Sequence, residues 1–151
     1  MIRRQFIKTL ALTAIGSSFI SLESEAAAAP AKGRSKLLSV GEALRFDDDL
    51  TITFVRVKKD QRCPINAMCL TAGDAEVILR VKVGSRKART VSLHTDNKPS
   101  SLVFPVRYPD GMVGIPKSFL VSIASLNPLP YAGKKTRQKD YRLKLAISTA
   151  V

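Results

Sequence analysis

The sequence predicts an all-β fold, an antiparallel β-sandwich of the immunoglobulin-like or Greek-key type with about seven to eight strands. Apolar and polar residues alternate through several short segments, which is the period of strands that bury one face. Turn segments rich in Gly, Pro, Asn and Asp separate them at regular intervals. Beyond the N-terminal leader, no stretch shows the sustained 3.6-residue period of an amphipathic helix. The 151 residues suffice for one domain of this kind.

Residues 1–28 have the three regions of a cleaved export signal: a basic start, a moderately apolar stretch and an Ala-rich end that fits an A-x-A cleavage site. The basic start resembles the twin-arginine (Tat) motif, Ser/Thr-Arg-Arg-x-Phe-Leu-Lys, with Ile2 in the place of Ser or Thr. An ordinary Sec signal is the alternative, because arginine pairs are common in such basic starts. Both routes place the mature protein in the periplasm or outside the cell. The residues that match the twin-arginine motif are Arg3, Arg4, Phe6 and Lys8.

Residues 29–36 are expected to form a flexible leader, and residues 37–151 a single β-sandwich domain without a transmembrane segment. The chain is strongly basic, since 25 Lys and Arg against 12 Asp and Glu give a formal charge of +13. Removing the signal takes away three cations and two carboxylates, so the domain remains basic. Such a charge attracts polyanions, for example acidic envelope polymers or nucleic acid. The simpler interpretation is that it keeps an exported protein in solution.

The first strands are expected at residues 37–40, 43–46 and 50–58, with an acidic turn at residues 47–49. In the third strand the apolar residues change phase, from even to odd positions, after Phe54. A shift of one residue exchanges the two faces of a strand, so this phase change predicts a β-bulge near Phe54.

Residues 75–83 show the clearest alternation in the chain, and residues 87–94 are expected to return beside them as a hairpin. A two-residue loop would place Arg80 opposite Arg89, and opposed like charges are destabilising. A three-residue loop instead aligns the apolar residues of both strands. The pairs expected from it are Val83 with Lys87, Leu79 with Val91, Val77 with Leu93, and Glu76 with His94.

In the second half of the domain, the sequence pattern predicts strands at residues 101–106, 119–126 and 140–149. Turn clusters and a Pro-rich break separate them. In the last strand, alternate residues are apolar and are expected to face the core. These inward residues are Tyr141, Leu143, Leu145 and Ile147.

The segment from Asp60 to Ala75 separates two long strands and contains both cysteines. Two cysteines in an exported chain indicate one disulfide, between Cys63 and Cys69. The alternative is a redox-active pair, but exchange-active cysteines usually have C-x-x-C spacing on a helix, not C-x5-C in a loop. We expect Arg62 to bond loop carbonyls or to pair with a nearby aspartate, either Asp60 or Asp74.

This segment resembles a group of small bacterial secreted proteins and lipoproteins with the signature Asp-Ser-Arg-Cys-Pro, four residues, Cys, one residue, Trp-Ala-Gly. The matching residues are Asp60, Arg62, Cys63, Pro64, Cys69, Ala72 and Gly73. Gln61 stands in place of Ser, and Thr71 in place of Trp. The C-terminal half fits the same group through Pro128 and Pro130, then Asp140-Tyr141-Arg142. The resemblance implies a fold and an exported location, not an activity.

Catalytic chemistry is not expected, because the single histidine, His94, has no free cysteine to activate and no other nucleophile–base pattern is present. We therefore predict a non-enzymatic binding or structural module of the cell envelope, with no cofactor. One alternative is a copper-type metal-handling or redox protein that uses His94, Met68 and the two cysteines.

A basic surface that binds an anionic envelope polymer or nucleic acid non-specifically is the other alternative. Sequence-specific readers of nucleic acid would show a recognition helix or stacking aromatics, which the sequence lacks. The cations expected on this surface are Arg80, Lys82, Lys134, Lys135, Arg137, Lys139, Arg142 and Lys144.

Overall fold

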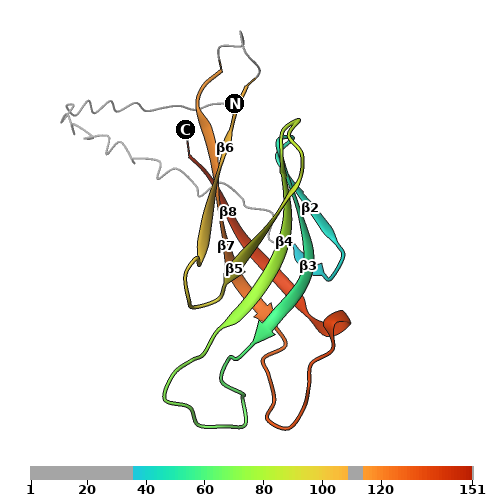
Figure 1. The fold of residues 1–151 in the computed structure, drawn as a ribbon, viewed down its shortest axis with the longest axis vertical. Helices are drawn as coiled ribbons and strands as arrows, with labels where there is room; N and C mark the ends of the chain where they lie inside the picture. Colours follow the sequence, from blue (N-terminus) through green and yellow to red (C-terminus); the bar gives the residue numbers. More distant parts are fainter. Residues whose placement is uncertain (1–35, 109–113, 151) are drawn as a thin grey trace, which may run out of the picture.

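The computed structural model describes residues 36–108 and 114–150, and it has two four-stranded antiparallel sheets (Figure 1). This confirms the predicted all-β antiparallel sandwich. The export-signal motif, residues 29–35 of the leader and residues 109–113 of one predicted turn lie outside the described residues.

The two sheets are each built mainly from hairpin neighbours. The first sheet has the order β2 (Ala43–Phe46), β3 (Leu50–Asp60), β4 (Ala75–Val83), β5 (Arg89–His94). The second has the order β1 (Leu37–Ser39), β8 (Arg142–Ala150), β7 (Lys117–Asn127), β6 (Ser101–Val106). Only β1 pairs out of chain sequence, beside β8, so the order differs from the ABED and CFG order of immunoglobulin domains.

The core lies between the inner faces of the two sheets. In β3, β4 and β8, buried residues alternate with more exposed ones, as the apolar pattern requires. The largest fully buried side chains are Phe54 from the first sheet and Phe104 and Phe119 from the second. Among the described residues no polar or charged residue is fully buried. The polar and charged side chains of the described residues therefore lie at the surface and in the loops.

The register predicted for the β4–β5 hairpin is confirmed: Leu79 pairs with Val91, and Glu76 with His94. The pairing of β3 with β4 shifts between Phe54 and Arg56, which confirms the predicted bulge. The sequence pattern did not predict a second shift, between Val57 and Lys59.

The last strand begins at Arg142, not at Asp140 as predicted, because Gln138–Asp140 form a short 3-10 helix, η1. The side-chain amide of Gln138 accepts a hydrogen bond from the Val57 backbone N–H (3.0 Å) and donates one to the Val57 carbonyl (2.8 Å). This pair of bonds replaces strand pairing at the edge of β3 and holds η1 there. Similarly, β5 begins at Arg89, two residues later than predicted.

Candidate functional site

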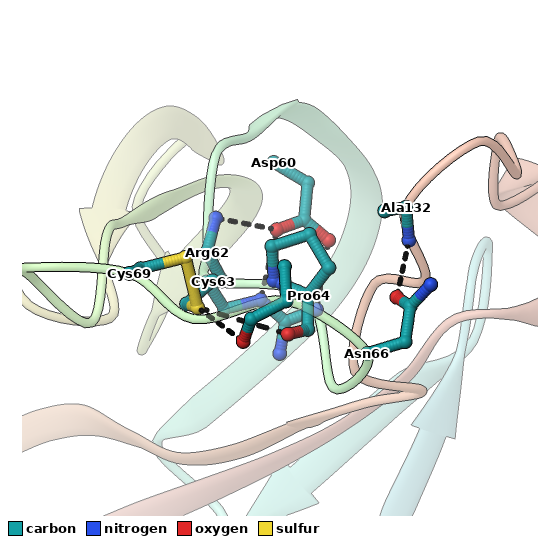
Figure 2. The surroundings of a disulfide bond; sticks show 8 residues. Asp60, Arg62, Cys63, Pro64, Asn66, Cys69 and Ala132 are labelled. Atoms are coloured by element: carbon teal, nitrogen blue, oxygen red, sulfur yellow. Dashed lines mark hydrogen bonds and ion pairs between the residues drawn. A yellow bond between two sulfur atoms is a disulfide. The ribbon is translucent and has the colours of Figure 1, made fainter.

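The loop between β3 and β4 is closed by a disulfide between Cys63 and Cys69, as predicted (Figure 2). At its base, Gln61 N–H donates to the Asp74 carbonyl and Cys63 N–H to the Ala72 carbonyl, each at 2.7 Å. These bonds continue the β3–β4 pairing into the loop. The disulfide and the two bonds together restrain the base of the loop.

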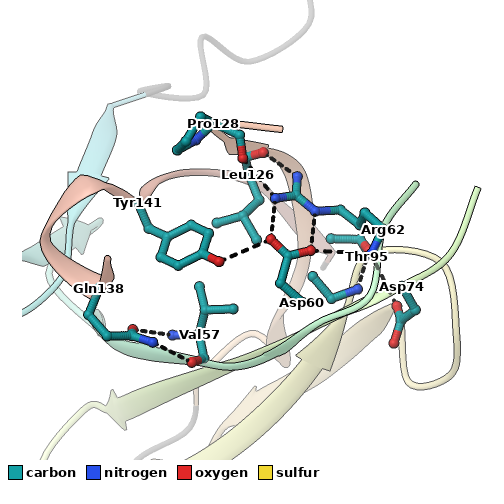
Figure 3. A network of polar contacts seen from close by, with 10 residues as sticks. Val57, Asp60, Arg62, Asp74, Thr95, Leu126, Pro128, Gln138 and Tyr141 are labelled. Carbon is teal, nitrogen blue, oxygen red and sulfur yellow. Dashed lines mark hydrogen bonds and ion pairs between the residues drawn. The ribbon is translucent and has the colours of Figure 1, made fainter. Parts of the chain in front are cut away.

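Arg62 connects this loop to the other sheet (Figure 3). Its Nε and Nη2 atoms donate to the two carboxylate oxygens of Asp60, at 2.9 and 2.8 Å. The same guanidinium donates to the carbonyls of Leu126 (2.5 Å) and Pro128 (2.9 Å), at the end of β7. Of the two aspartates predicted as partners of Arg62, Asp60 is therefore the one that forms the ion pair. The predicted bonds to carbonyls are also present, but they reach across the sandwich to the end of β7.

Tyr141 completes this network, because its hydroxyl donates to Asp60 Oδ2 at 3.0 Å. Burial opposes ionisation of Asp60, but the hydrogen bonds and the charge of Arg62 outweigh it and hold the Asp60 pKa below its usual range. Burial raises the pKa of Tyr141, and the neighbouring Asp60 charge raises it further. The tyrosine therefore remains a hydroxyl donor to an ionised carboxylate, and all three side chains act as structural supports for the loops.

A second set of bonds joins the disulfide loop to the β7–β8 loop beside it, at the end of the molecule where β3 ends (Figures 1 and 2). The Ile65 N–H donates to the Pro130 carbonyl at 3.0 Å. The Ala132 N–H donates to the Asn66 side-chain oxygen at 2.7 Å. The two loops consequently form one continuous surface.

This surface carries several large apolar side chains that point into solvent. Met68 and Leu70 are fully exposed, and the others are half-exposed or more. We call the set the apolar tip: Ile65, Met68, Leu70, Leu129 and Tyr131. Sequence reasoning missed it, apart from Met68, which was considered only as a metal ligand. The signal was present as apolar residues inside turn segments, where polar residues are usual.

Lysines adjoin the apolar tip. Lys134 and Lys135 are exposed and, with Leu129 and Tyr131, line a cavity of about 430 Å³. Neither lysine forms an ion pair within the described residues, whereas Arg137 on the same cavity is paired with Asp140 at 2.8 Å. This end of the domain therefore combines an apolar surface with uncompensated positive charge.

The eight predicted surface cations do not form one surface. Arg80 and Lys82 lie on β4 of the first sheet, whereas Arg142 and Lys144 lie on β8 of the second. The remaining four lie in the β7–β8 connection near the apolar tip. Arg142 also donates two hydrogen bonds to the carbonyls of Lys139 and Tyr141, so its guanidinium is partly occupied.

The predicted metal candidates have other partners. The two cysteines are bonded to each other, so neither offers the thiolate that a copper site takes. The His94 Nδ1 atom lies 2.6 Å from the Asp74 carboxylate. Met68 belongs to the apolar tip. Across residues 36–108 and 114–150, no three His, Cys, Asp or Glu side chains gather as a metal site would require.

No family model, curated protein or solved structure matches this chain. The resemblance to the small secreted proteins therefore stays a prediction. In the part of the chain that the structure describes, no helix is long and apolar enough to span a bilayer.

Asp74, at the end of the disulfide loop that leads into β4, connects this loop to the turn after β5. It accepts hydrogen bonds from His94 and from the backbone N–H groups of Asp96 (3.0 Å) and Asn97 (3.2 Å). Burial opposes the ionisation of Asp74, but these bonds outweigh it and hold its pKa well below the usual range. An aspartate with a lowered pKa stabilises the fold above its unfolded pKa of about 3.9, and this contribution is lost as the pH falls below that value.

We therefore expect the free energy of unfolding to decrease progressively from about pH 5 to below pH 3, toward the lowered folded pKa of Asp74, and the decrease to be smaller in Asp74→Asn than in the wild type. At pH 7 the variant should be less stable, and the two proteins should converge in acid. Urea denaturation at each pH measures this. Asp48→Asn is the control, because the described residues show no hydrogen bond or ion pair to that exposed carboxylate. Parallel pH curves for Asp74→Asn and the wild type would contradict the role of Asp74.

Proposed function

We propose that this protein is an exported, non-enzymatic binding module that attaches reversibly to an anionic lipid surface through the apolar tip and the neighbouring lysines. The observation that carries the proposal is the position of five exposed apolar side chains on two loops that are bonded together at one end of the sandwich. The signal-like residues 1–28 and the disulfide support export.

Single exposed apolar residues are ordinary on soluble proteins, whereas a contiguous apolar patch marks an interaction site. Burying a Leu or Met side chain fully contributes about 1.5–3 kcal/mol. Each lysine near an anionic membrane surface adds about 1 kcal/mol. Met68 and Leu70 with Lys134 and Lys135 therefore supply enough free energy for reversible attachment, which neither pair provides alone.

The rigidity of the tip favours binding as well. Ordering a flexible loop on binding consumes part of the interaction free energy. Here the disulfide and the Arg62 contacts hold the loop before any partner arrives. The exposed side chains are therefore presented with little further ordering of the backbone, which is how a preorganised site gains affinity.

Vesicle sedimentation of the processed protein tests the proposal. We expect binding to vesicles that contain phosphatidylglycerol, weaker binding to phosphatidylcholine alone, and a decrease with added salt. Met68→Thr/Leu70→Thr should reduce partitioning about tenfold or more, since it removes at least about 1.4 kcal/mol of apolar burial.

The matched control is Val103→Thr/Leu120→Thr, which removes two exposed apolar residues from the second sheet. This variant should bind like the wild type. Equal loss in both double variants, or no binding to phosphatidylglycerol vesicles, would refute attachment through the apolar tip.

A further inference from the structure

A second charged cavity lies at the other end of the strands, away from the apolar tip. In β3 and β4, Asp60 pairs with Ala75 at the tip end, and Leu50 pairs with Val83 at the far end. The far cavity has a volume of about 270 Å³. Four cations line it, and we call it the basic pocket: Arg86, Lys87, Arg89 and Arg107.

The basic pocket has a concentrated positive charge. No carboxylate lines it, and none of its four cations forms an ion pair within the described residues. The carboxylates of the acidic turn, Asp47 and Asp49, already contact Lys117. Asp49 also accepts a hydrogen bond from the Gly84 N–H through its carbonyl, which places the acidic turn beside the β4–β5 turn. The charge of the pocket is therefore not cancelled by these neighbours.

The pocket walls hold at least one cation in a defined position. The Arg89 guanidinium lies over the Phe104 ring, 5.0 Å from its centroid, and Phe104 is buried. Stacking on a ring leaves the N–H edges of a guanidinium available, and these edges match the oxygens of a phosphate in a bidentate manner. The apolar side chain of Val81 lies beside it in the lining, and a low-dielectric wall strengthens the attraction for an anion.

The cations come from three separate segments. Arg86 and Lys87 belong to the β4–β5 turn, Arg89 begins β5, and Arg107 follows β6. They meet because β5 and β6 are the edge strands of the two sheets, at the open side of the sandwich. The volume of about 270 Å³ lies just below the usual range for drug-sized ligands and suits a short chain of small anionic groups. The positive charge of the four cations exceeds the negative charge of one phosphate, so the pocket can hold more than one phosphate group. The exposed β4–β5 turn extends the site into solvent, where a longer chain could continue.

From these observations we propose that the basic pocket binds consecutive phosphate groups of an anionic polymer. The site is independent of the apolar tip and of lipid attachment. Free inorganic phosphate presents the same chemistry from another source, so the test includes both.

Isothermal titration with tripolyphosphate and with orthophosphate measures the interaction. We expect tripolyphosphate to bind more tightly than orthophosphate and to weaken with added salt. Arg89→Gln/Arg107→Gln should lower the affinity for tripolyphosphate about tenfold or more, because each arginine contributes charge-assisted hydrogen bonds. Arg80→Gln/Lys82→Gln removes the same charge from the outer face of β4 and should retain most of the affinity.

Met68→Thr/Leu70→Thr should bind tripolyphosphate like the wild type, which separates this site from the apolar tip. If Arg89→Gln/Arg107→Gln does not fold, Arg86→Gln/Lys87→Gln in the exposed turn replaces it, with the same expected direction. Equal losses in the pocket and outer-face variants would show general charge attraction and overturn the proposal. Equal affinity for the two phosphates would overturn the assignment to a polymer, and no binding of either would overturn the site itself.

Discussion

Arg62→Met should lower the free energy of unfolding at pH 7 by about 3–5 kcal/mol. This is the usual cost of removing one partner of a buried ion pair and leaving the other charge in place. The side chains of Arg62 and Asp60 are each only 9% exposed. Removing the guanidinium leaves the Asp60 carboxylate with Tyr141 as its remaining side-chain donor. It also leaves the Leu126 and Pro128 carbonyls without the donor that they share. The Asp60 carboxylate and the Leu126 carbonyl, which are shielded from water, account for most of the expected loss, since Pro128 is exposed and its carbonyl can bond solvent.

Urea denaturation of the oxidised protein measures this loss. Arg137→Met is the matched control, since Arg137 also pairs with an aspartate, Asp140, but its side chain is 69% exposed. We expect the control to lose less than about 1 kcal/mol, as exposed ion pairs do. Asp60→Leu/Arg62→Met removes both charges and should recover part of the loss. If Arg62→Met and Arg137→Met are equally stable, Arg62 does not connect the two sheets as the contacts indicate.

The fold was predictable because it depends on local patterns. Alternation in residues 75–83 and the repulsion between Arg80 and Arg89 fixed both the strand and the hairpin register without any distant contact. The bulge after Phe54 was visible as a change of phase in the apolar residues. Each of these features is decided by residues within one hairpin or one strand.

The start of β8 was not predictable in the same way. Alternation alone continues back to Asp140, but the Gln138 amide bonds the backbone of Val57, which is 81 residues away. A polar side chain in a loop has many backbone partners available, and only the packed fold selects one. The same reason explains why Arg62 had several candidate partners before the carbonyls of Leu126 and Pro128 were placed beside it.

The two proposed sites were not predicted as units, because each brings together segments that are distant in the sequence. The apolar tip joins residues on either side of β4–β7, through the Ile65 and Asn66 hydrogen bonds. The basic pocket requires β5 and β6 to be edge strands of different sheets. Since the sites lie at opposite ends of β3 and β4, attachment to lipid through the tip would direct the basic pocket away from the membrane. A polymer held there would not compete with the bilayer for the same cations.

Gly73→Ala is expected to lower the free energy of unfolding by about 3 kcal/mol or more. Gly73 has φ +72°, a left-handed conformation that costs an L-residue about 1–2 kcal/mol. In addition, a Cβ atom there would lie 2.0 Å from the Gln61 carbonyl oxygen and 2.9 Å from the Arg62 Cα atom. Both are backbone atoms, so no side-chain rotation relieves the contact. The hydrogen bonds on either side, from Gln61 to Asp74 and from Cys63 to Ala72, resist any widening of the loop.

Gly41→Ala separates the two causes. Gly41 also has a positive φ, +86°, but an added Cβ would meet no atom within 4 Å. This variant should lose only the conformational part, about 1–2 kcal/mol, so the difference between the two variants measures the close approach of residues 72–74 to residues 61–63. Equal losses in urea denaturation would mean that the loop relaxes around the methyl group. In that case the loop would not be rigid, and the preorganised presentation of Met68 and Leu70 would lose its physical basis.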